Sequence, residues 1–157
     1  MSGLLPCPWP VEALLPHAPP MVLLDEALGY AQDRIRVAAA IRPDHPFATP
    51  RGVPAHVGIE LMAQACGAFA GAHALAAGGA PRLGFLLGTR RYQANDDWFR
   101  IGDRLEIWAQ VAFRDEEMGV FDCRVERGGE VVAEAQLTVY QPKNPNAVLA
   151  SQKGDHA

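Results

Sequence analysis

The stretch PAHVGIELMAQACGAFAGAHALAAGG, residues 54–79, decides the fold. It is apolar on nearly every side. It opens with a proline, which suits the first helical position, and closes with two glycines, which suit a helix end. The stretch therefore predicts one long helix from about residue 54 to residue 77. A helix with no polar face must be covered on several sides by the rest of the domain.

Segments that alternate apolar and polar residues lie on both sides of this helix. We expect strands at residues 21–30, 34–42, 83–93, 105–113, 121–126 and 131–139. Gly128 and Gly129 supply the positive backbone angles of a tight hairpin turn between the last two. No helical pattern separates the later strands. We therefore predict an α+β architecture, in which one antiparallel sheet wraps around one long central helix.

Length and composition bound the function. The chain has 157 residues and a formal charge of -4, which argues against a nucleic-acid partner. We expect a single domain over residues 1–142 and a polar, disordered tail over residues 143–157. The three cysteines are far apart and form no CxxC pair, which predicts reduced thiols in a cytoplasmic protein. Polar residues interrupt the long helix, so we expect no membrane span.

Three segments resemble the hot-dog-fold 3-hydroxyacyl-[acyl-carrier-protein] dehydratases. LLPHAPPMVLLD, residues 14–25, is similar to the "LPHRxPFLLVD" segment of that family. PAHVGIELMAQ, residues 54–64, is similar to "PGVLxxEAMAQ", which opens the family's central helix. GFLLGTRRY, residues 84–92, resembles a strand of the dehydratase-like branch found with aryl-polyene pathways. The resemblance implies the hot-dog fold.

The resemblance also implies a pair of site residues. In the family, an acid and a histidine from different chains meet in a tunnel at a dimer interface, and the acid maps onto Glu60. The family's spacing puts the histidine at position 46, which is proline here, and His45 precedes it. His56 is a rival, because it lies four residues before Glu60 on the same helix face. Which histidine acts as base stays open.

Dehydration of a 3-hydroxyacyl thioester gives these residue types a purpose. A histidine can take the C2 proton near neutral pH, and a carboxyl among apolar groups can donate a proton to the leaving hydroxyl. Unpaired N–H groups of Val57 or Gly58 at the helix start would polarise the thioester carbonyl. Gln64, one turn beyond Glu60, would hold the acid or a water. The helix dipole alone also favours an acid in this turn.

The sequence therefore predicts a dehydratase that forms a trans-2-enoyl thioester in fatty-acid or polyene-type lipid synthesis. Two alternatives stay open: a non-catalytic hot-dog partner in a heteromeric dehydratase, and an acyl thioesterase that activates water with Glu60. Expected partners are an acyl carrier protein or CoA thioester and a second hot-dog subunit, identical or different. We expect no metal and no organic cofactor. His17 is expected to be structural, and His73 to be packed or capping.

Overall fold

The computed structural model describes residues 3–15, 21–82 and 84–142. Its helices are α1 (Val11–Leu14), the single 3-10 turn η1 (Ala55–Val57) and α2 (Gly58–Ala76). Its strands are β1 (Glu26–Tyr30), β2 (Arg34–Ala40), β3 (Val53–Pro54), β4 (Phe85–Ala94), β5 (Trp98–Phe99), β6 (Arg104–Arg114), β7 (Met118–Arg127) and β8 (Glu130–Tyr140). His17 and the predicted tail, residues 143–157, lie outside the described residues.

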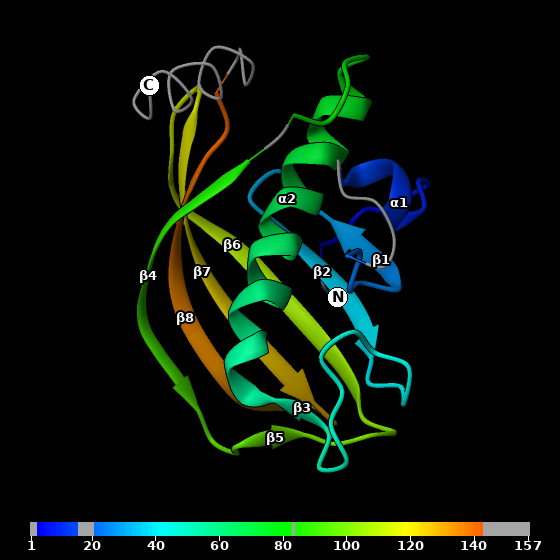
Figure 1. The fold of residues 1–157 in the computed structure, drawn as a ribbon. Helices are drawn as coiled ribbons and strands as arrows, with labels where there is room; N and C mark the ends of the chain where they lie inside the picture. Colours follow the sequence, from blue (N-terminus) through cyan, green and yellow to red (C-terminus); the bar gives the residue numbers. More distant parts are fainter. Residues whose placement is uncertain (1–2, 16–20, 83, 143–157) are drawn as a thin grey trace, which may run out of the picture.

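Six strands form one antiparallel sheet in the order β1-β2-β6-β7-β8-β4, and α2 runs across one of its faces (Figure 1). The alternation along the strands turns every second side chain toward this helix. Phe69 of α2 meets Phe121 of β7 edge to face, with ring centroids 5.6 Å apart. The buried thiols of Cys66 and Cys123 lie 3.7 Å apart across the same contact. The predicted α+β architecture is confirmed.

Helix α1 packs against α2 at a glycine. A Cβ at Gly71 would overlap the carbonyl oxygen of Leu14, so the two backbones approach as closely as they do only because position 71 has no side chain. None of the helices among the described residues is long and apolar enough to cross a membrane.

The helix boundaries follow the sequence pattern only in part. The C-terminal end agrees, because α2 stops at Ala76 and Gly78 adopts a left-handed φ of 82°. The N-terminal end differs. Pro54 pairs with Trp98 in the short β3–β5 ladder, and the regular helix begins only at Gly58, after the 3-10 turn. A two-residue strand such as β5 is too short to leave a periodic signal in the sequence.

The first predicted strand, residues 21–30, is wrong over its first half. Strand β1 begins at Glu26. The backbone groups of Met21 and Leu23 bond the side chain of Gln64 in α2 instead of a neighbouring strand. The hairpin prediction is confirmed, since Gly128 and Gly129 have φ of 60° and 85° between β7 and β8.

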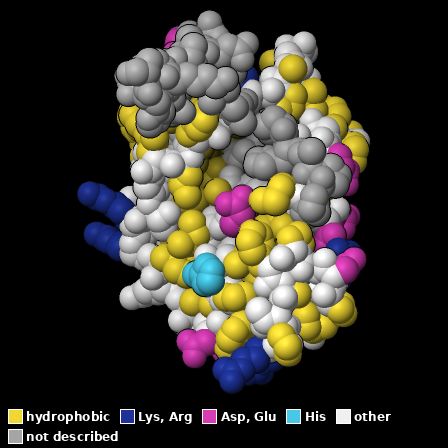
Figure 2. Space-filling view, viewed as in Figure 1, with side chains coloured by type: hydrophobic (Ala, Val, Ile, Leu, Met, Phe, Trp, Pro, Cys, Tyr) yellow, Lys and Arg dark blue, Asp and Glu magenta, His cyan; other side chains and the backbone are white. Residues whose placement is uncertain are grey.

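The two outer strands of the sheet differ in how they are covered. At the β1 edge, Leu5 exchanges two backbone hydrogen bonds with Tyr30, of 2.7 and 3.0 Å. At the other edge, β4 pairs with β8 on one side only, within the part of the chain that the structure describes. Leu86 and Leu87 of β4 are 41% and 58% exposed. Hydrophobic side chains gather on the face shared by α2 and β4 in Figure 2.

Candidate active site

Glu60 lies in the first turn of α2, half-buried, beside a cavity of about 140 Å³ that we call the Glu60 cavity. The cavity lies between α2, the start of β4 and the end of β8. It is lined by Glu60, Ala63, Gln64, Gly67, Arg82, Gly84, Leu86, Val139 and Gln141. A cavity near this size holds about one benzene-sized group. The acid is therefore placed beside a space large enough for the reacting end of a small acyl group.

Gln64 ties Glu60 to the segment that precedes β1. Gln64 is 1% exposed, and it is the only buried polar or charged residue among the described residues. Its Oε1 accepts from the N–H of Leu23 at 2.8 Å. Its Nε2 donates to the carbonyl of Met21 at 2.6 Å and, over a longer 3.4 Å, to Glu60 Oε1. If the amide were flipped, its NH2 group would face the N–H of Leu23 and its oxygen would face the carbonyl of Met21. Neither pair can hydrogen-bond, so the orientation of the amide is fixed.

His45 lies in the loop between β2 and β3, beside a different cavity of about 150 Å³. Burial lowers its pKa below the usual value, although the nearby carboxylates of Asp25 and Asp44 oppose the shift. The ring is therefore neutral at pH 7. Its Nδ1 accepts from the N–H of Phe47 at 3.1 Å. Its Nε2 is buried and has no hydrogen-bond partner among the described residues.

Within one chain, the described residues do not bring His45 and Glu60 together. They face separate cavities, and Leu23 lies between them: it lines the His45 cavity and is held by Gln64 from the Glu60 side. The ion pair of Asp25 with Arg42, at 2.7 Å, borders the His45 cavity.

His56 occupies the 3-10 turn before α2 and is exposed. It does not line the Glu60 cavity, and no described residue hydrogen-bonds its ring. Its pairing with Glu60 stays a prediction. The backbone N–H of Gly58 donates to the carbonyls of Ala55 and His56 inside the turn, so Gly58 already has acceptors. The roles predicted for Val57 and Gly58 toward a thioester stay predictions.

Tyr92 of β4 supports the start of α2, and sequence reasoning missed it. Its hydroxyl donates to the carbonyl of Ala55. Burial raises the pKa of Tyr92 to about 12, so it stays protonated at any ordinary pH. A Cβ at Gly58 would clash with this hydroxyl. The signal in the sequence was the glycine at position 58, the first residue of α2, where a side chain would ordinarily be favourable.

His73, which the sequence predicts to be packed or capping, has a structural role. His73 is packed between the rings of Tyr30 and Phe69 and hydrogen-bonds the carbonyl of Ala31 at 2.9 Å, as predicted for a packed residue. Within the described ranges, no three His, Cys, Asp or Glu side chains are grouped as metal ligands.

A long buried helix wrapped by one antiparallel sheet, with an acid early in that helix beside a cavity, is the arrangement of a hot-dog protein. The family model described as "ApeP-like: ApeP dehydratase" matches residues 9–150. The chain belongs to this family. The match confirms the resemblance to the hot-dog dehydratases and to their aryl-polyene branch.

Solved structures agree with this assignment. A chain of "The Dehydratase Heterocomplex ApeI:P from Xenorhabdus doucetiae" is 30% identical, with a TM-score of 0.85 over 90% of this chain and 97% of that chain. A hypothetical thioesterase from Streptococcus pneumoniae TIGR4, solved with coenzyme A, is 14% identical, with a TM-score of 0.59 over 74% and 84%. The E. coli PaaI protein is also 14% identical, with a TM-score of 0.57 over 73% and 81%.

The last two similarities concern the fold alone. Among curated proteins, no sequence matches this chain.

Proposed function

We propose that this chain is a 3-hydroxyacyl-[acyl-carrier-protein] dehydratase subunit that forms a trans-2-enoyl thioester in polyene-type lipid synthesis in the cytoplasm. The observation that carries the proposal is the position of Glu60. Glu60 is half-buried at the side of a cavity, and the amide of Gln64 donates a hydrogen bond to one of its two carboxyl oxygens, Oε1. The second oxygen, Oε2, is then the one that meets the substrate.

The reaction needs one proton removed and one proton supplied. A histidine base takes the proton from C2, and the electron pair of that C–H bond forms the C2=C3 double bond. Glu60 gives its proton to the C3 hydroxyl, and the C3–O bond breaks to release water. Return of the C2 proton from the histidine to Glu60, directly or through solvent, resets both groups. The N–H of Val57 would polarise the thioester carbonyl as charge develops on its oxygen.

His45 is the better candidate for the base. Its lowered pKa keeps it neutral, and its buried Nε2 has no partner among the described residues. In the present ring orientation Nδ1 accepts the Phe47 N–H, so Nε2 carries the proton. Acting as a base would therefore require the ring to turn or the Phe47 contact to break. His56 is the alternative, because it sits exposed at the helix start.

A second hot-dog subunit would complete the site. Strand β4 carries the sheet edge that no described segment covers, and its exposed Leu86 also lines the Glu60 cavity. A partner that pairs along β4 would bury Leu86 and Leu87 and close the open side of the Glu60 cavity. Since His45 and Glu60 of one chain face separate cavities, the histidine that meets Glu60 is proposed to come from the partner.

One observation favours a second candidate, a non-catalytic subunit of a heteromeric dehydratase. A solved relative at 30% identity is part of a heterocomplex. The separation of His45 and Glu60 within the chain is what a subunit without a working site of its own would also have.

The test supplies a 3-hydroxyacyl thioester of acyl carrier protein to the purified chain, alone and with a hot-dog partner. Formation of the conjugated enoyl thioester is followed by absorbance and by the mass of one lost water. Glu60→Gln should abolish the signal, whereas the matched control Glu130→Gln, at the exposed first position of β8, should not. Full activity in Glu60→Gln would remove the assignment. Release of free thiol instead of enoyl product would identify a thioesterase.

A further inference from the structure

A second, smaller space lies beside α2 and shares lining residues with the Glu60 cavity. This space, about 20 Å³, lies against the turn between β6 and β7, and we call it the hairpin pocket. Arg82, Val139 and Gln141 line both spaces. These three residues therefore form the partition between them.

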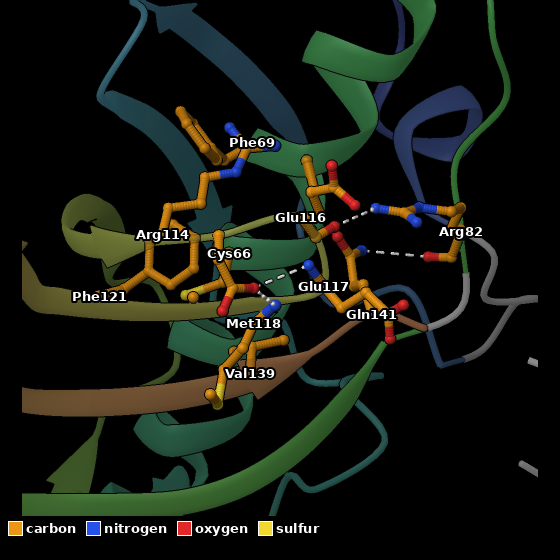
Figure 3. A pocket seen from close by; sticks show the side chains of 13 residues that line it. Cys66, Phe69, Arg82, Arg114, Glu116, Glu117, Met118, Phe121, Val139 and Gln141 are labelled. Carbon is orange, nitrogen blue, oxygen red and sulfur yellow. Dashed lines mark hydrogen bonds between the residues drawn. The ribbon is translucent and has the colours of Figure 1, made fainter. Parts of the chain in front are cut away.

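Two side-chain hydrogen bonds, drawn as dashed lines in Figure 3, join the polar residues of this partition. Arg82 Nη2 donates to the carbonyl of Glu116 at 3.2 Å, and Gln141 Nε2 donates to the carbonyl of Arg82 at 3.2 Å. We call this pair of contacts the clasp. Both bonds lie at the long end of the normal range. Arg82 and Gln141 are only half-buried, so the clasp can open without disturbing the core.

Helix α2 gives both spaces a smooth floor. Ala63 and Gly67 face the Glu60 cavity, and Ala70 faces the hairpin pocket. At a rise of about 1.5 Å per residue, the distance along the helix from Glu60 to Ala70 is about 15 Å. Since these floor positions carry nothing larger than a methyl group, an extended chain can lie along them.

The buried wall of the hairpin pocket is apolar. Phe69 and Phe121 form its wall, together with the buried thiol of Cys66. Burial raises the pKa of Cys66 well above its usual value, so the thiol is uncharged. The guanidinium of Arg114 lies over the Phe69 ring, 5.2 Å from its centroid, and covers the pocket from outside (Figure 3). Asp115, Glu116 and Glu117 of the β6–β7 turn also line the pocket, and Asp115 and Glu116 are exposed, so the polar lining lies toward solvent. The buried wall suits a hydrocarbon end and not a charged one.

We propose that the acyl chain of the substrate runs along α2 from Glu60 toward Phe69, and that the clasp of Arg82 and Gln141 limits its length. With the clasp closed, the Glu60 cavity accepts a short chain. With the clasp open, the chain reaches the hairpin pocket. The assignment of the cavity to an acyl thioester rests on the proposed function. The clasp adds the residues that decide chain length.

The experiment measures binding, so that it does not depend on turnover. Non-reactive pantetheine amides of 3-hydroxybutanoate, 3-hydroxyoctanoate and 3-hydroxydodecanoate are titrated into the full chain, with its partner where one is needed, by calorimetry. Arg82→Ala and Gln141→Ser open the clasp, and Ala70→Leu fills the hairpin pocket. Arg104→Ala is the control: an exposed arginine at the opposite end of β6 from the β6–β7 turn.

Each methylene that leaves water for apolar surroundings contributes about fourfold in affinity. Arg82→Ala and Gln141→Ser should therefore raise the ratio of dodecanoyl to butanoyl affinity by about tenfold or more. Ala70→Leu added to either clasp variant should cancel that rise, and Arg104→Ala should match the wild type. An unchanged ratio in both clasp variants would overturn the inference, as would failure of every amide to bind. Shifted binding ratios without any enoyl formation would overturn the dehydratase activity alone.

Discussion

Replacement of Gln64 by leucine tests how the acid is held in place. Leucine has nearly the volume of glutamine, so the change creates little cavity, but it removes every hydrogen bond of the amide. The N–H of Leu23, in a residue that is 5% exposed, then has no acceptor. The carbonyl of Met21, in a residue that is 44% exposed, can turn to water instead.

The free energy of unfolding should therefore fall by about 1–3 kcal/mol, the cost of one buried donor left without an acceptor. For a chain of this size, each kcal/mol lowers the melting temperature by about 2–4 °C. Gln64→Leu should thus melt about 2–12 °C below the wild type, with the loss of free energy confirmed by urea unfolding. Gln110→Leu, an exposed glutamine on β6, is the control and should change stability by less than about 0.5 kcal/mol. Equal stability of the two variants would refute the role given to the Gln64 amide.

Three further predictions concern pH, packing and assembly. Burial holds the pKa of His45 below its usual 6.5. As the pH falls, this imidazole is therefore protonated in the unfolded chain before it is protonated in the folded chain. The free energy of unfolding should therefore drop between about pH 7 and pH 5, and His45→Asn should flatten that slope in urea titrations; an unchanged slope would contradict it. Gly58→Ala should cost about 1–3 kcal/mol by clashing with the Tyr92 hydroxyl. Gly58→Ala combined with Tyr92→Phe should recover part of the loss, and a fully stable single variant would exclude the clash. Leu86→Asp on the uncovered edge of β4 should leave circular dichroism unchanged and prevent subunit pairing in light scattering, and intact pairing would place the interface elsewhere.

The architecture was predictable because its signals are local. The apolar stretch at residues 54–79 and the alternating strands each show their period within a short window. Gly128 and Gly129 identify a hairpin from two residues. These patterns need no knowledge of distant contacts, and the structure confirms them except at the ends of the elements and over the first half of the strand predicted at residues 21–30.

The predictions from the sequence are wrong where contacts with residues distant in the chain determine the local structure. Residues 21–25 are apolar enough to resemble a strand, but the Gln64 side chain takes the backbone hydrogen bonds of Met21 and Leu23. Tyr92 fixes the start of α2 from a strand that follows the helix in sequence. The sequence could place Glu60 early in the helix and Gln64 one turn further. It could not show that His45 faces a separate cavity, because that depends on how the loop before β3 folds back.

The most direct measurement of the central claim uses the assembled complex with a substitution in this chain only. The rate of enoyl formation from a 3-hydroxyacyl thioester is compared between the wild type and Glu60→Gln of this chain, with an unaltered partner. If Glu60 is the acid, the rate should fall by about 10²–10⁴, the usual contribution of a positioned proton donor. An unchanged rate, lost only when the partner's own acid is replaced, would contradict the account and leave this chain a non-catalytic subunit.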